Sequence, residues 1–128
     1  MSLRESLRIM VVDDMSTSRG LIVQALEWMG IKHIAESADA TAALGALARA
    51  PVHLVLSDYN MPGMDGLGLL QKLRTTPSTA RLGFILVTGR ADATLVAEGQ
   101  RLGMNNLIKK PFTPQALKDC IERVVGRL

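Results

Sequence analysis

Short, continuously apolar segments alternate with longer amphipathic segments along this chain, and the alternation occurs five times. Strands that are apolar on both sides are typical of a parallel sheet covered by helices on both faces. The segments between them repeat their apolar residues at the spacing of one helix face. The pattern therefore predicts five parallel strands joined by right-handed crossovers. The predicted strands are Arg8–Val12, Lys32–Glu36, Val52–Ser57, Gly83–Thr88 and Asn106–Lys109.

The amphipathic segments predict five helices. Apolar side chains recur at helical spacing from Leu21 to Met29, and Gly30 then ends the pattern. Near the end of the chain, Thr113 is a suitable N-cap and Pro114 suits the first helical position. The predicted helices are Ser16–Met29, Asp39–Arg49, Gly66–Thr75, Asp92–Leu102 and a last one that opens at Thr113 and carries an apolar stripe as far as Leu128.

Five strand–helix units predict an α/β fold with a five-stranded doubly wound parallel sheet. Residues 1–128 fit a single domain. Apolar residues make up 48% of the chain and aromatic residues only 3%, so the predicted core is aliphatic. Such a sheet binds ligands beyond the carboxyl ends of its strands.

Composition and charge exclude some function classes. No apolar run approaches the roughly 20 residues that span a bilayer, and the first residues lack the apolar stretch of a signal peptide. Cys120 is the only cysteine and has no internal partner, which fits a reducing compartment. The net charge of +3 comes from scattered basic residues without interleaved aromatics, which argues against nucleic-acid binding. We expect a cytoplasmic monomer.

Reactive side chains collect where the predicted strands end. The first strand leads to Asp13 and Asp14, the third to Asp58, the fourth to Thr88 and the fifth to Lys110. Each of these residues alone is most simply a turn former, a strand residue or a surface lysine. In a parallel sheet, however, all of these ends meet at the same edge, and independent turn formers would not gather there.

The combination at this edge predicts phosphoryl-transfer chemistry. Three carboxylates repel one another unless a cation joins them or their pKa values rise. Carboxylate oxygens suit a hard ion such as Mg²⁺, which also binds phosphate oxygens. A lysine and a threonine hydroxyl can hold the other phosphoryl oxygens while one carboxylate acts as the nucleophile.

The chain resembles the receiver domains of two-component response regulators, and among them the stand-alone chemotaxis receivers of the CheY type. The resemblance extends over essentially the whole chain and implies the flavodoxin-like (βα)5 form of the sheet with strand order 2-1-3-4-5. It is carried by four motifs. These motifs are Asp-Asp-Met-Ser-Thr-Ser-Arg at 13–19, Ser-Asp-Tyr-Asn-Met-Pro-Gly-Met-Asp-Gly at 57–66, Val-Thr at 87–88 and Lys-Pro-Phe-Thr at 110–113.

The resemblance implies that Asp58 is the phosphoacceptor and attacks the phosphohistidine of a partner kinase. It implies that Asp14 and Asp58 bind Mg²⁺ directly, together with the backbone carbonyl of Asn60. Asp13 would act mainly through a bound water. Gly66 resembles the turn glycine through which the chain enters the third helix.

Two further roles follow from the same resemblance. Lys110 would grip the phosphoryl oxygens, and a cis peptide bond is expected between Lys110 and Pro111. Thr88 would swing toward the new phosphoryl group and start the conformational switch.

The chain departs from the family pattern three positions before Lys110, where Leu107 occupies a place that is usually aromatic. Two interpretations stay open: a smaller apolar residue in the same role, or an altered coupling of Thr88 to the outer face. Arg90 and Asn60 flank the path of the water that hydrolyses the phosphoaspartate in the family. A long cation at position 90 suggests slow or atypical dephosphorylation.

The resulting hypothesis is a single-domain response regulator of a probable chemotaxis relay, phosphorylated by a CheA-like histidine kinase. It would catalyse only its own phosphotransfer and dephosphorylation, so it is not an enzyme toward external substrates. The expected downstream partner is a flagellar motor switch protein or another protein, and a phosphate sink is also open. The alternative is a phosphorylation-independent adaptor, or a receiver module that binds a nucleotide or second messenger. A hydrolase is disfavoured because Asp58 would itself be consumed and regenerated.

Overall fold

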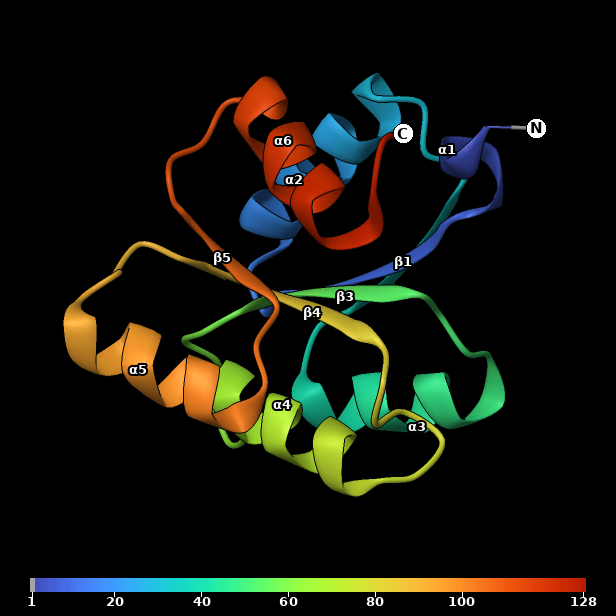
Figure 1. Ribbon diagram of the computed structural model, residues 1–128. Helices are drawn as coiled ribbons and strands as arrows, with labels where there is room; N and C mark the ends of the chain where they lie inside the picture. Colours follow the sequence, from blue (N-terminus) through green and yellow to red (C-terminus); the bar gives the residue numbers. More distant parts are fainter. Residues whose placement is uncertain (1) are drawn as a thin grey trace.

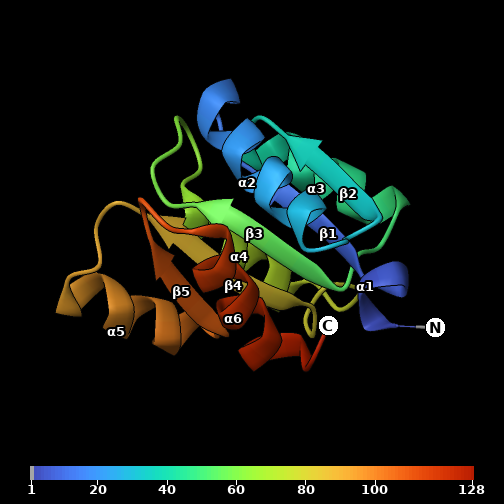
Figure 2. The same cartoon turned by 90° about the horizontal axis from the view of Figure 1, so that it is seen from above.

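A computed structural model describes residues 2–128 and contains one five-stranded parallel sheet in the order β2-β1-β3-β4-β5 (Figures 1 and 2). This order is the predicted one. The strands are β1 Arg8–Val12, β2 His33–Ser37, β3 Leu54–Asp58, β4 Gly83–Thr88 and β5 Asn106–Lys109.

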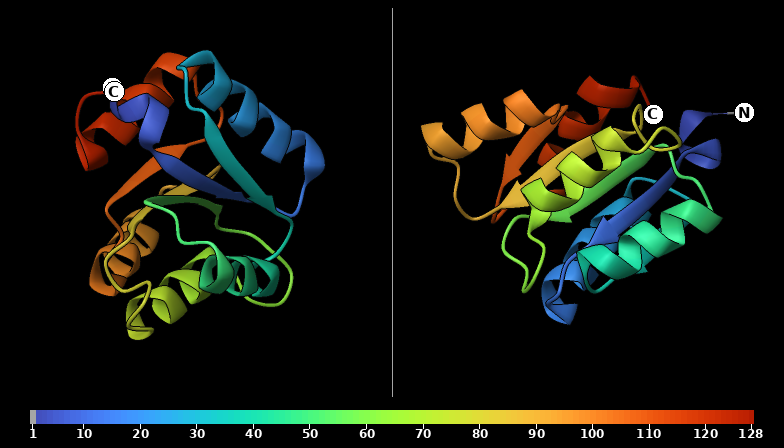
Figure 3. Two further views of the ribbon diagram at one scale, coloured as in Figure 1. Left: turned by 90° about the vertical axis from the view of Figure 1, so that its right-hand side faces the viewer. Right: turned by 90° about the horizontal axis from the view of Figure 1, so that it is seen from below.

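Helices cover both faces of the sheet. In Figure 1, α2 and α6 lie above the sheet, whereas α3, α4 and α5 lie below it, and the lower three are seen side by side in the right panel of Figure 3. The helices are α1 Leu3–Ser6, α2 Ser16–Trp28, α3 Ala40–Arg49, α4 Gly66–Thr75, α5 Ala93–Leu102 and α6 Pro114–Val125. None of the helices within residues 2–128 is long and apolar enough to cross a membrane.

Several predicted boundaries were wrong by one or two residues. Asp39 and Asp92 are N-caps rather than helical residues, and their side chains accept from the backbone N–H groups of Ala42 and Leu95 at 2.7 and 2.9 Å. The third strand begins at Leu54 and includes Asp58, and the second is displaced by one residue. Helix α6 ends at Val125, so the apolar stripe continues to Leu128 without helical structure.

Helix α1 was not predicted. A segment of four residues is too short to show a helical repeat of apolar residues, and none of its residues is buried. Its presence changes nothing at the carboxyl edge of the sheet.

The core consists of two aliphatic layers, one on each face of the sheet. One layer joins α2 and α6 to the strands, and the other joins α3, α4 and α5 to them. The largest fully buried side chain is Phe84, and most of its buried companions are Leu, Ile and Val, as the composition predicted. Among residues 2–128, three large apolar residues are instead exposed, and all lie in or next to α2: Met15, Leu21 and Trp28, each with about 60% of its surface accessible (61%, 59% and 60%).

Gly66 joins the site to the lower layer because it permits a close approach of two backbone segments. A Cβ atom at this position would lie 2.3 Å from the carbonyl oxygen of Asp58 and 2.9 Å from Leu86 Cδ1. The φ angle of Gly66 is not positive, so space rather than backbone conformation requires glycine here. The N-cap Asp65, which accepts from Gly68 N at 2.8 Å, starts α4 immediately before it.

We expect Gly66→Ala to destabilise the protein by about 1–3 kcal/mol, because the nearest atom is backbone and cannot move aside easily. Gly20→Ala in α2 is the matched control, since a Cβ there meets nothing within 4 Å, and better helix propensity should stabilise the protein by about 0.5–1 kcal/mol. Urea unfolding of both variants measures the two effects, and equal stabilities would contradict the steric explanation.

Candidate acidic site at the carboxyl edge of the sheet

Three carboxylates lie together beyond the carboxyl ends of β1 and β3. Asp13 and Asp14 follow β1 directly, and Asp58 is the last residue of β3. One side-chain oxygen from each lies within 4.8 Å of the others. Asp13 is fully buried, Asp58 is 7% exposed and Asp14 is open to solvent. The cluster is therefore a pocket with a buried floor and one accessible carboxylate.

Lys110 brings a positive charge into this pocket from the end of β5. Its Nζ atom lies 3.1 Å from Asp58 Oδ1, 3.4 Å from Asp13 Oδ2 and 2.9 Å from the hydroxyl of Ser18. The peptide bond from Lys110 to Pro111 is cis, as expected, and the Lys110 N–H donates to Thr88 O at 2.7 Å. One ammonium group thus bridges two of the three acids.

Sequence reasoning missed two residues that support the pocket. Ser18 lies in the first turn of α2 and holds Lys110, while Arg19 donates to the backbone carbonyl of Asp13 at 2.7 Å and to Glu36 at 3.1 Å. The side chain of Asp13 also accepts from Met15 N at 3.0 Å. Ser18 and Arg19 are part of a motif that carries the family resemblance, but spacing alone gives no signal for their partners.

The pocket makes ionisation of the Asp58 carboxyl less favourable than it is in water. Burial is the main cause that raises the pKa of Asp58 above its ordinary value, and the neighbouring charge of Asp13 adds to it. The hydrogen bond and charge of Lys110 act in the opposite direction, as does the backbone N–H of Tyr59, but they do not cancel the rise. A divalent cation at these oxygens would relieve the repulsion, so the donor set fits a hard metal ion.

Thr88 and Leu107, the two predicted switch residues, occupy different places. Thr88 ends β4 and is buried, and its hydroxyl accepts a hydrogen bond from the backbone N–H of Arg90 at 3.0 Å. Leu107 is half-buried in β5, opposite Leu86 of β4, and packs on the core layer of α3, α4 and α5. Asn60 is exposed in the loop two residues after Asp58. The structure therefore groups the acids with Lys110 and leaves Leu107 in the apolar layer.

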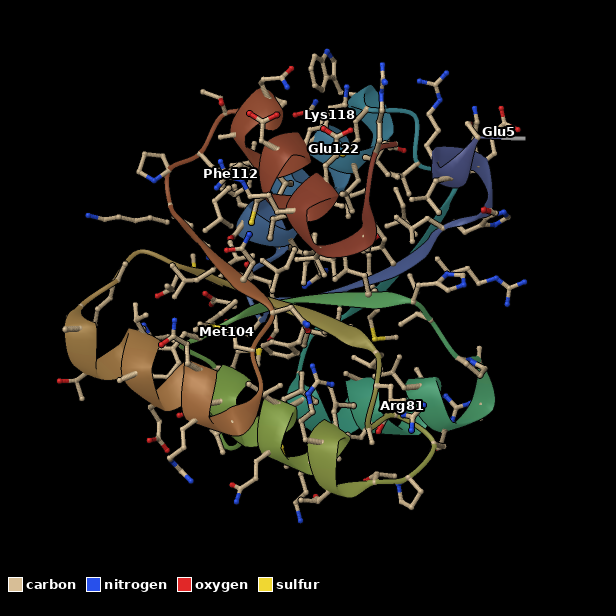
Figure 4. All side chains as sticks on the ribbon, in the orientation of Figure 1. Glu5, Arg81, Met104, Phe112, Lys118 and Glu122 are labelled. Atoms are coloured by element: carbon tan, nitrogen blue, oxygen red, sulfur yellow. The ribbon has the colours of Figure 1, made fainter. Side chains whose placement is uncertain are left out.

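An apolar groove begins at the edge of the acidic site. It has a volume of about 730 Å³ and lies between α2 and the loop that leads into α6. Figure 4 labels Phe112 on this loop. Leu21, Trp28 and Phe112 line its apolar part, and Ser18 and Lys110 are also among its lining residues. The groove and the acidic pocket thus share two residues that hydrogen-bond to each other.

Comparison with known proteins agrees with this geometry. The profile of the response regulator receiver domain matches residues 9–122. The chain is 43% identical to a probable chemotaxis protein CheY of Rhizobium etli over all of this chain and 99% of that protein. It is 36% identical to chemotaxis protein CheY of Pseudomonas aeruginosa, over 95% of this chain and 98% of that protein. The crystal structure of Vibrio cholerae CheY4 at low pH superposes with a TM-score of 0.87 at 25% identity, covering 92% and 98% of the two chains. The chain therefore belongs to the response regulator receiver family, and it is a signalling protein of the CheY type.

Proposed function

We propose that this protein accepts a phosphoryl group on Asp58 from the phosphohistidine of a kinase and signals through the resulting conformational change. The observation that carries this proposal is the contact of Lys110 Nζ with Asp58 Oδ1 at 3.1 Å, inside a cluster of three carboxylates. A lysine that is directed at one carboxylate is ready to bind the oxygens of a phosphoryl group attached there.

The transfer moves the phosphoryl group from a histidine nitrogen to a carboxylate oxygen of Asp58. A carboxylate oxygen of Asp58 attacks phosphorus, a P–O bond forms and the P–N bond to the histidine breaks. The bonding electron pair leaves with the imidazole nitrogen, which takes up a proton. Water later attacks the acyl phosphate, releases inorganic phosphate and restores the carboxylate, so the protein turns over only its own phosphoryl group.

The acidic residues support Mg²⁺ as the partner ion. Asp13, Asp14 and Asp58, with the backbone carbonyl of Asn60, would hold it, because Mg²⁺ prefers oxygen ligands and accepts one or two carboxylates beside phosphate oxygens. When bound, Mg²⁺ neutralises the charge that gathers on the phosphoryl group. Lys110 orients that group, and the Thr88 hydroxyl turns toward it.

The relatives named as chemotaxis proteins support a place in a chemotaxis relay. On this proposal residues 1–128 form one receiver domain, the protein is a cytoplasmic monomer, and its kinase is CheA-like. The downstream partner is a flagellar motor switch protein, or the chain serves as a phosphate sink. Leu107 favours an output that does not depend on an aromatic side chain at that position.

We infer that a helical segment of the kinase docks in the groove beside α2. An apolar groove along one helix fits the apolar stripe of a second helix. Because Ser18 and Lys110 belong both to the groove and to the acidic site, a segment seated there brings its phosphohistidine to Asp58.

Phosphorylation itself tests the proposal. Wild type incubated with Mg²⁺ and a small acyl phosphate donor should gain the mass of one phosphoryl group, whereas Asp58→Asn should gain none. Asp39→Asn, which removes a carboxylate outside the pocket, should be labelled like wild type. If wild type is not labelled in a Mg²⁺-dependent manner, the proposed function is wrong, and an adaptor function would replace it.

A second prediction concerns stability. Because the pKa of Asp58 is raised in the folded protein, its ionised form opposes folding, and this cost is fully present once the pH exceeds the folded-state pKa. Asp58→Asn should therefore raise Tm at neutral pH in EDTA. Mg²⁺ should raise Tm of wild type by binding only the folded state, and should raise that of Asp58→Asn much less. Equal Mg²⁺ effects on both proteins would argue against Asp58 as a ligand.

A third prediction separates docking from chemistry. Trp28→Ala should raise KM for a phosphorylated CheA-like kinase by about tenfold, the usual effect of truncating a central interface tryptophan. Transfer from a small acyl phosphate should not change, since such a donor needs no groove. Gln71→Ala, an exposed change on α4, is the control and should alter neither rate. A loss with both donors would mean that Trp28 supports the pocket rather than the kinase.

A further inference from the structure

Arg90 makes two contacts that join the acidic site to the start of α5. Its backbone N–H donates to the Thr88 hydroxyl at 3.0 Å, and its guanidinium Nε pairs with one carboxylate oxygen of Asp92. The other oxygen of Asp92 accepts from Leu95 N at 2.9 Å and so caps α5. Thr88, Arg90 and Asp92 therefore form one polar chain from the end of β4 to the first turn of α5.

We propose that Asp92 is a positioning residue that holds the Arg90 guanidinium at the start of α5, and that Arg90 binds the phosphoryl oxygens on Asp58 once it leaves Asp92. This inference rests on the proposed phosphorylation of Asp58. It goes beyond that function by assigning a second cation to the phosphoryl group and a carboxylate that competes for this cation.

The register of β3 against β4 decides where the loop that carries Arg90 begins. Asp58 pairs in register with Val87, the residue before Thr88, and neighbouring strands lie only about 4.8 Å apart. The loop that carries Arg90 therefore starts beside Asp58.

The pair of Arg90 with Asp92 is suited to exchange because it is weak. The two side chains are 63% and 41% exposed. An exposed ion pair of this kind changes the equilibrium between its paired and separated forms by no more than about fivefold. A phosphoryl group with two or three charged oxygens is a stronger acceptor for the planar guanidinium than one carboxylate. Phosphorylation can therefore draw Arg90 away without a large energetic cost.

Thr88 links this exchange to the conformational switch. When its hydroxyl turns toward the phosphoryl group, the Arg90 N–H loses its acceptor. Both contacts of Arg90 then open together, and the N-terminus of α5 loses a neighbouring cation while Asp92 keeps its cap to Leu95. The rearrangement reaches α5 without any movement of the side chain at position 107.

Asparagine at position 92 separates the two roles of Asp92. Asn is as good an N-cap as Asp, so Asp92→Asn keeps the cap and removes the charge that holds Arg90. Asp39→Asn is the matched control, because Asp39 caps α3 in the same way and the substitution removes the same charge.

Beryllofluoride, an analogue of the phosphoryl group, is the probe. Its affinity in Mg²⁺ is measured by calorimetry for wild type, Asp92→Asn, Arg90→Ala and the double variant. We expect Asp92→Asn to bind about two- to fivefold more tightly than wild type, the range set by an exposed ion pair. Arg90→Ala should bind more weakly, and the double variant should equal Arg90→Ala. Asp39→Asn should equal wild type, and the lifetimes of phospho-Asp58 should follow the same order.

Three outcomes would overturn the inference. If Asp92→Asn binds like wild type, Asp92 does not restrain Arg90. If the gain persists in the Arg90→Ala background, it arises from the cap or the net charge instead. If folded wild type neither binds beryllofluoride nor takes a phosphoryl group, the proposed function fails and this inference fails with it. If wild type takes a phosphoryl group but all variants bind beryllofluoride with the same affinity, the proposed function stands and only this inference is rejected.

Discussion

Repulsion among the carboxylates at one edge of the sheet is the constraint to which the rest of the site responds. Asp13 is fully buried and Asp58 nearly so, and water therefore screens their charges poorly. Lys110 contacts both, at 3.4 and 3.1 Å, but one ammonium cannot balance three carboxylates. Burial is the largest cause of the raised pKa of Asp58; the charge of Asp13 adds to the rise, and the contacts of Lys110 reduce it. A divalent cation at these oxygens would neutralise part of the negative charge, and the donor set fits such an ion.

The parallel sheet is what concentrates these charges. Lys110 and Asp13 are 97 positions apart in the chain, yet both follow strands that run in the same direction, so they meet without any local sequence signal. The backbone contributes as well: Lys110 N–H is fixed on Thr88 O at 2.7 Å, and Gly66 allows α4 to begin against the carbonyl of Asp58. The two core layers pack against the strands that carry the acids, one on each face of the sheet.

The sequence allowed the parallel sheet and the grouping of the acids with Lys110 to be predicted, because both follow from periodicity and from the direction of parallel strands. The strand order was implied by the family resemblance. The sequence did not allow the contacts between side chains to be predicted. Ser18 on Lys110 and Arg90 on Asp92 depend on rotamers and loop paths that no spacing encodes. The N-caps Asp39 and Asp92 lie inside the helices that the sequence predicts, because a cap differs from a first helical residue only in its backbone angles. The apolar groove was missed because Leu21 and Trp28 share the periodicity of core residues.

Leu107 and Arg90 together indicate how a signal can leave this site. An aliphatic side chain has no polar atom with which to follow the Thr88 hydroxyl, so position 107 can transmit a change only through packing against its core layer. Close-packed layers resist small displacements. The contacts from Thr88 through Arg90 to Asp92 are polar and partly exposed, and the second arrangement that we propose for Arg90 would give them the two discrete states that coupling requires. On the proposed exchange of Arg90, the output reaches α5 through the loop between β4 and α5, a route in which the side chain at position 107 takes no part.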